Sequence, residues 1–164
     1  MPAERRVLRR RIHAVLVWRN ASDVTVHGGY DATAGGGNDP GPRTGEATVI
    51  QRKLGNGIRV MTLAGVSNCT IEQVTFRDGS DPAGGGHGVY LTNCWDVTFA
   101  GCVVSNNGGG AFSACGLGLL LNRSSAVLTN TTIANNVIRG LAWGCVGGGI
   151  YIDSASRLTA IRSS

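Results

Sequence analysis

The chain has 164 residues, of which 42% are hydrophobic, 15% are charged and 26 are glycine. This length suits one domain and excludes two folded enzyme domains. So many glycines disfavour a helical bundle, because each interior glycine costs a helix about 1 kcal/mol relative to alanine. Four prolines are too few for a disordered low-complexity chain. The composition therefore predicts an all-β protein rich in turns.

The net positive charge lies within the first twenty residues. Six arginines and Glu4 give this segment a balance of +5, which equals the net charge of the whole chain. A nucleic-acid-binding surface spreads basic and aromatic residues over a folded face, and no later segment does so. We therefore expect no nucleic-acid partner.

Residues 1–20 form a basic segment that we expect to cap the domain that follows it, over residues 21–164. Val7, Ile12 and Val15 recur on one helical face, which is compatible with a capping helix, and a first strand over 13–18 is equally compatible. The apolar run 14–18 is too short for the core of a signal peptide or for a membrane span. We expect neither in this chain.

An internal repeat organises the rest of the chain. The segments 69–78, 97–106 and 126–135 align at offsets of 28 and 29, and apolar residues alternate within each. Further strands begin at glycine in 88–91, 118–121 and 149–152. No helical segment separates these runs, so the repeat predicts a parallel β-helix whose coils stack about 4.8 Å apart.

The alignment assigns the inward-facing columns of this β-helix. They are Cys69, Val97, Ala126; Ile71, Phe99, Leu128; Val74, Cys102, Thr131; and Phe76, Val104, Ile133. Asp78, Asn106 and Asn135 share the next corner, where a short polar side chain can bond the turning backbone or adopt the left-handed conformation.

Several segments resemble bacterial right-handed β-helix proteins of the pectate-lyase-like and polymorphic-outer-membrane-protein-like kinds. These are 23–31, the Gly- and Pro-rich stretch to Gly45, 47–50, and the Gly-Gly-Gly-Ile-Tyr unit at 147–151. The resemblance implies a right-handed parallel β-helix that is secreted or attached to the cell surface and binds glycans or cell surfaces. It does not choose among lyases, hydrolases, adhesins and passenger domains, because the fold carries all of them.

The domain has room for about five coils, fewer than is usual among such proteins. We therefore expect a truncated solenoid or part of a longer one. The last strand-like segment, 157–161, has an open backbone edge, which favours end-to-end self-association.

Three loops, 79–87, 107–116 and 136–148, interrupt the coils at one corner, and loops on a rigid scaffold commonly carry function. Asp78, Asp81 and His87 are candidate catalytic residues, because paired carboxylates serve glycoside hydrolysis. Under a lyase alternative Arg77 would be the base, and only then would Ca²⁺ be needed. Gly86-His87-Gly88 resembles an element of polygalacturonases, but the other elements of that family are missing. We expect no other cofactor and no bound metal.

A non-catalytic alternative uses polar and aromatic side chains to bind sugars. The candidate binding residues are Asn106 and Asn107 at the corner, with Tyr90, Trp143 and Tyr151 as stacking surfaces. Tyr90 and Tyr151 take nearly equivalent positions, one residue out of register.

The five cysteines contain no Cys-x-x-Cys motif, which argues against a zinc ribbon or a thioredoxin-like site. Cys69 and Cys102 are expected to fill inward positions. Cys115 and Cys145 lie one repeat apart in successive loops, so stacking in register would bring them within disulfide range.

Together with the resemblance, the sequence favours a surface or secreted β-helix module that binds a polysaccharide or cell-surface glycan, or serves as a structural passenger. A lyase or hydrolase acting on an acidic polysaccharide is the alternative.

Overall fold

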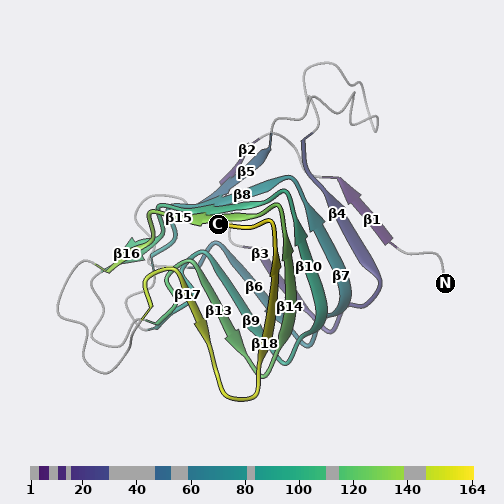
Figure 1. Cartoon of the computed structure of the whole chain (residues 1–164). Coiled ribbons are helices and arrows are strands. Elements are labelled where there is room, and N and C mark those ends of the chain that lie inside the picture. The colour runs from purple at the N-terminus through teal and green to yellow at the C-terminus, as the bar shows by residue number, and fades with distance from the viewer. Residues whose placement is uncertain are drawn as a thin grey trace.

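A computed structural model describes residues 4–7, 11–13, 16–29, 47–52, 59–80, 84–109, 115–138 and 147–164. Throughout these residues the chain winds as a solenoid of short strands, and each strand lies against its counterpart in the neighbouring coil (Figure 1). The described residues contain no helix, and so none that could cross a membrane. The expected all-β parallel solenoid is confirmed.

Three parallel sheets, which we name A, B and C, form the sides of the solenoid, and the chain visits them in that order in each coil. Sheet A has six strands, and sheets B and C have five each. Sheet A contains β1 (Glu4–Val7), β4 (Val24–His27), β7 (Ser67–Glu72), β10 (Trp95–Ala100), β14 (Ser125–Thr129) and β18 (Arg157–Ile161). Sheet B contains β2 (Arg11–His13), β5 (Thr48–Gln51), β8 (Val74–Arg77), β11 (Val103–Ser105) and β15 (Thr132–Ala134). Sheet C contains β3 (Leu16–Arg19), β6 (Met61–Ala64), β9 (Val89–Thr92), β13 (Leu119–Asn122) and β17 (Ile150–Ile152).

A fourth, two-stranded sheet extends the corner between sheets B and C. It pairs β12 (Gly108–Gly109) with β16 (Val137–Ile138). These two strands begin the loops that were expected to emerge side by side, and the pairing confirms that arrangement for their described parts.

The inward columns match those read from the repeat. Val97 pairs with Cys69 and Ala126, and Phe99 pairs with Ile71 and Leu128. On sheet B, Val104 pairs with Phe76 and Ile133. Nearly all of these side chains are buried in one core that runs along the solenoid axis. Alternating residues face this core because successive side chains of a strand point to opposite faces of the sheet.

The described residues among the first twenty, 4–7, 11–13 and 16–20, belong to a coil of the solenoid rather than to a helical cap. β1, β2 and β3 pair in parallel with β4, β5 and β6. Of the two alternatives left open by the sequence, the strand is therefore right, and the capping helix is wrong for the described residues. The spacing of apolar residues in this segment is compatible with a helix, but pairing with the strands of the next coil stabilises the strand instead, since tertiary context overrides local sequence preference.

Left-handed backbone marks the corner after sheet B. Asp78, Asn106 and Asn135 have φ angles of 62°, 55° and 55°. Asparagine and aspartate adopt this conformation at lower cost than other residues with a Cβ atom. The expected role of these three residues as corner formers is confirmed.

Candidate functional site

A polar groove with a volume of about 790 Å³ lies at the corner between sheets B and C. Gln51 pairs with Arg77, Arg77 with Ser105, and Ser105 with Ala134. The next residue of each coil therefore takes the same corner position, which brings four polar side chains into one row along the groove. They are Arg52, Asp78, Asn106 and Asn135, and we call them the corner row.

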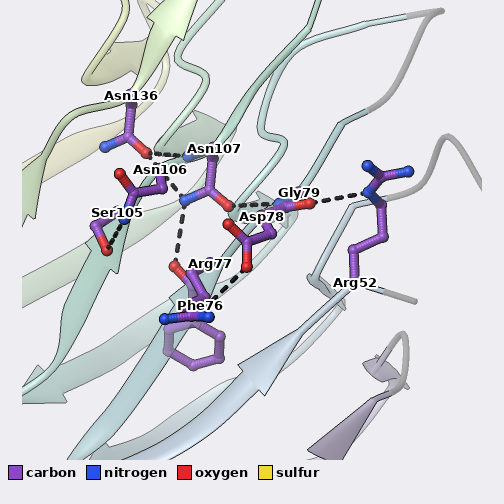
Figure 2. A network of polar contacts seen from close by, with 9 residues as sticks. All are labelled: Arg52, Phe76, Arg77, Asp78, Gly79, Ser105, Asn106, Asn107 and Asn136. Carbon is purple, nitrogen blue, oxygen red and sulfur yellow. Dashed lines mark hydrogen bonds and ion pairs between the residues drawn. The ribbon is translucent and has the colours of Figure 1, made fainter. Parts of the chain in front are cut away.

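Two arginines flank Asp78, one that lines the groove and one beside it (Figure 2). Arg77 Nε lies 3.0 Å from Asp78 Oδ2, and the two side chains are 39% and 44% exposed. From the preceding coil, Arg52 Nε donates a 2.9 Å hydrogen bond to the main-chain carbonyl oxygen of Asp78. Arg52 lines the groove, and Arg77 lies beside it through its contact with Asp78. Two guanidinium groups and one carboxylate therefore lie at this corner and give it an excess of positive charge.

Asn107 and Asn136 hold the corner from inside (Figure 2). The Asn107 side chain is 1% exposed. Its Nδ2 donates to Phe76 O at 3.2 Å and to Asn136 Oδ1 at 2.9 Å, while its Oδ1 accepts from Gly79 N at 2.9 Å. Although Asn107 borders the groove, its amide is engaged with the protein. We therefore assign it to corner stability, and Asn106, which is exposed, remains the better candidate for ligand contact.

The structure brings only part of the candidate catalytic set together. Arg77 and Asp78 are paired at the groove, but the His87 side chain is 0% exposed, with Nε2 2.6 Å from Gly84 O. Gly109 in β12 covers the imidazole ring, because a Cβ atom added to this glycine would lie 3.3 Å from His87 Cε1. Asp81 lies outside the described residues. His87 in this position packs the loop and does not face the groove.

Tyr90 and Tyr151 lie in one column on the outer face of sheet C. Both pair with Leu120, so the offset of one residue expected between them is wrong. The chain from Leu120 to Tyr151 is one residue longer than that from Tyr90 to Leu120, so the two coils differ in length although their strands stay in register. The Arg59 guanidinium lies 4.4 Å from the centre of the Tyr90 ring. Trp143 lies outside the described residues.

The cysteines divide into buried thiols and one disulfide-bonded residue. Cys69, Cys94 and Cys102 are free and buried, as expected for Cys69 and Cys102. Burial raises the pKa of Cys102 to about 11, and burial together with the nearby Cys94 raises that of Cys69 to about 11. Cys115 is disulfide-bonded. Cys145 lies outside the described residues, so the proposed Cys115–Cys145 pairing stays a prediction.

The groove also contains residues that the sequence did not single out. Gln51 and Arg52 occupy the coil before Arg77 and Asp78, at a shorter offset than the one that relates the later coils. Alignment of the repeat could have found them only by allowing for unequal turns. Among the described residues, no three His, Cys, Asp or Glu side chains are grouped so that they could hold a metal ion.

Comparison with known proteins identifies the fold family. Residues 56–164 match the model of the right-handed β-helix region family. No curated protein and no solved structure matches the chain. The match covers more than half of the chain, and the parallel coils agree with it throughout the described part. The chain therefore belongs to the right-handed β-helix family.

Proposed function

We propose that the protein is a non-catalytic β-helix module that binds an acidic polysaccharide along the polar groove. The corner row is the observation that carries this proposal. It supplies one polar side chain per coil, at the strand spacing of about 4.8 Å. An extended polysaccharide presents its sugar rings at a similar repeat, so successive rings can meet successive coils.

The charge of the groove favours a ligand with carboxylate groups. Arg52 lines the groove and Arg77 lies beside it, and guanidinium groups bind the carboxylates of uronate residues. Asn106 and Asn135 are both exposed and can donate to and accept from sugar hydroxyl groups. Binding should weaken as salt concentration rises, since the charged groups lie at the surface.

Binding is favoured over catalysis by the state of the candidate catalytic groups. Asp78 is paired with Arg77, so both side chains are engaged with each other. His87 is buried and is not among the residues that line the groove. A general acid or base must reach the substrate by direct hydrogen bonding or through one water molecule.

The substitution Asp78→Asn distinguishes binding of a polyanion from catalysis by a hydrolase or lyase. Asparagine already fills the equivalent position in the next two coils with the same left-handed backbone, so the fold should tolerate the change. If the groove binds polyanions, removal of this carboxylate frees Arg77, and affinity for oligogalacturonate or oligoalginate rises several-fold. If the protein is a hydrolase or lyase, wild type releases reducing or unsaturated ends, and Asp78→Asn abolishes that release.

Calorimetric titration with these oligosaccharides, combined with assays for product, tests the proposal. Arg52→Ala should weaken binding several-fold. Arg19→Ala removes the same charge from an exposed position on sheet C and should leave affinity unchanged. Equal affinities for wild type, Arg52→Ala and Asp78→Asn would contradict a role for the groove.

We also propose a secreted or cell-surface location, as the resemblance implies. The disulfide at Cys115 supports this, because disulfides persist in oxidising compartments. Alkylation of the unfolded protein without reductant should modify the three free cysteines, and pre-treatment with reductant should make all five reactive. Modification of all five without reductant would argue against the disulfide and the location.

A further inference from the structure

The residues along the polar groove change in character from its first coil to its last. Three columns of described residues follow the groove, each with one residue per coil. The first, on the outer face of sheet B beside the groove, is Gln51, Arg77, Ser105 and Ala134. The second is the corner row, Arg52, Asp78, Asn106 and Asn135. The third comes two residues later in each coil and is Ser80, Gly108 and Val137, since Gly108 pairs with Val137 and its main-chain nitrogen bonds to Gly79 O.

All of the charge in these three columns lies in the first two coils. Arg52 belongs to one of these coils, and Arg77 and Asp78 belong to the next (Figure 2). We call these three residues the charged end of the groove. Their two guanidinium groups and one carboxylate give it a net charge of +1. One carboxylate of a ligand is therefore enough to neutralise the charged end.

The last coil is uncharged in all three columns and partly apolar. Ala134, Asn135 and Val137 form this neutral end, and Val137 is 51% exposed where it lines the groove. A ligand carboxylate over these residues would lose water to the valine methyl groups and would meet no guanidinium group among the described residues of that coil. A neutral sugar would instead offer hydroxyl groups to the Asn135 amide and its C–H face to Val137. The neutral end therefore disfavours charge on the part of the ligand that it contacts.

We infer that the groove takes a polysaccharide whose uronates are isolated among neutral sugars, with one uronate at the charged end and neutral rings over Asn106 and Asn135. This inference rests on the function proposed above and narrows the class of ligand. With about one ring per coil, the uronate stands at one end of a segment of about four rings. All three columns change in the same direction, so the groove also fixes the direction in which the chain binds.

Titration calorimetry with tetrasaccharides that share one backbone tests the inference. The probes are tetragalacturonate, its fully carboxyl-reduced neutral form, and two forms that keep a single uronate, at the reducing or at the non-reducing end. One single-uronate form should bind the wild type at least as tightly as tetragalacturonate does, because only one carboxylate meets the charged end. The other should bind several-fold more weakly, since its uronate falls on the neutral end. The neutral form should also bind several-fold more weakly than the preferred form.

Asn135→Arg adds a guanidinium group to the neutral end. The left-handed backbone accepts arginine, because Arg123 and Arg162 have φ angles of 47° and 49° in this chain. The variant should bind tetragalacturonate several-fold more tightly than the wild type and lose the preference between the two single-uronate forms. Asn130→Arg is the matched control. Asn130 is exposed, with a φ of 48°, at the corner between sheets A and B and does not line the groove, so the same charge there should change neither result. Thermal unfolding of both variants verifies that the solenoid is intact.

Three results would overturn the inference and leave the groove as a site for polyanions. The first is that the wild type binds tetragalacturonate more tightly than either single-uronate form. The second is equal affinity of the wild type for the two single-uronate forms. The third is an unchanged preference between them in Asn135→Arg, which would mean that the neutral end does not contact the ligand. Failure of the wild type to bind any of the three acidic probes would instead contradict the proposed function itself.

Discussion

The side chains of Asn107 and Asn136 lie one coil apart at the same corner, joined by a 2.9 Å hydrogen bond from Asn107 Nδ2 to Asn136 Oδ1. The same oxygen accepts from Asn107 N at 3.0 Å, and Asn136 Nδ2 donates to Val104 O at 2.9 Å. Each asparagine thus bonds main-chain groups of the preceding coil at a corner where the ladder of sheet B has ended. This arrangement fixes the floor of the polar groove.

Asn107→Ala should therefore destabilise the fold. It leaves Gly79 N and Phe76 O without their side-chain partner in a buried corner, and each such loss costs about 1–3 kcal/mol. We expect a loss of about 2–4 kcal/mol in the free energy of unfolding, measured by urea denaturation. Ser105→Ala, on the outer face beside it, should cost less than about 0.5 kcal/mol. Similar costs for both variants would show that the amide contributes little.

Glycine opposite these asparagines is a second requirement of the corner. A Cβ atom on Gly88 would lie 2.6 Å from Asn107 Nδ2 and 2.7 Å from Val104 Cγ1. Gly88→Ala should cost more than about 2 kcal/mol, because the buried neighbours would have to move. Gly149 is its equivalent two coils later, and there the nearest atom, Ile133 Cγ2, is 3.8 Å away.

Gly149→Ala is therefore the matched control, with an expected change between no effect and a gain of about 1 kcal/mol from a less flexible unfolded chain. Thermal unfolding of both variants measures the difference. Equal destabilisation would mean that backbone freedom, rather than space beside Asn107, requires glycine in this column.

The sequence predicted the solenoid well because each inward column repeats the same chemical character. Phe99, for example, aligns with Ile71 and Leu128 both in the repeat and in the strand pairing. Strand alternation and the period of the repeat are local signals, and stacking in register preserves them. The asparagine and aspartate corner was predictable for the same reason.

The site was less predictable, because turns of unequal length hide which residues meet. Arg52 reaches Asp78 across a coil whose length differs from the regular period, so no fixed offset connects them. The exposure of His87 depends on β12, which packs over its ring, and the Gly-His-Gly sequence does not predict that contact.

Cys102 occupies a position that a hydroxyl group fills in the next coil. Its Sγ lies 3.3 Å from Ile71 O and 3.6 Å from Ala100 O, and Thr131 Oγ1 makes the equivalent contacts to Phe99 O and Thr129 O. Cys102→Ser should therefore cost less than about 1 kcal/mol, because the new hydroxyl group inherits hydrogen-bond acceptors.

Cys69→Ser provides the contrast. Cys69 is 1% exposed, and its thiol makes no hydrogen bond with any described residue. A buried hydroxyl group without a partner should cost about 1–3 kcal/mol. Urea denaturation of the two serine variants compares them directly. A larger cost at position 102 than at position 69 would contradict the equivalence with Thr131.

The buried thiols also predict that stability falls at alkaline pH. Burial raises the pKa of Cys102 from 9.0 in the exposed state to about 11 in the folded protein. Below about pH 9 the thiol is neutral in both states, and its contribution to stability is fully present. Between about pH 9 and pH 11 the unfolded chain loses the proton first, so rising pH favours unfolding by up to about 2–3 kcal/mol. The free energy of unfolding, measured at intervals over this range, should decline more steeply for wild type than for Cys102→Ala, which has no thiol to ionise there. Parallel curves for the two proteins would mean that this thiol ionises with the same pKa in both states, and that solvent reaches it in the folded solenoid.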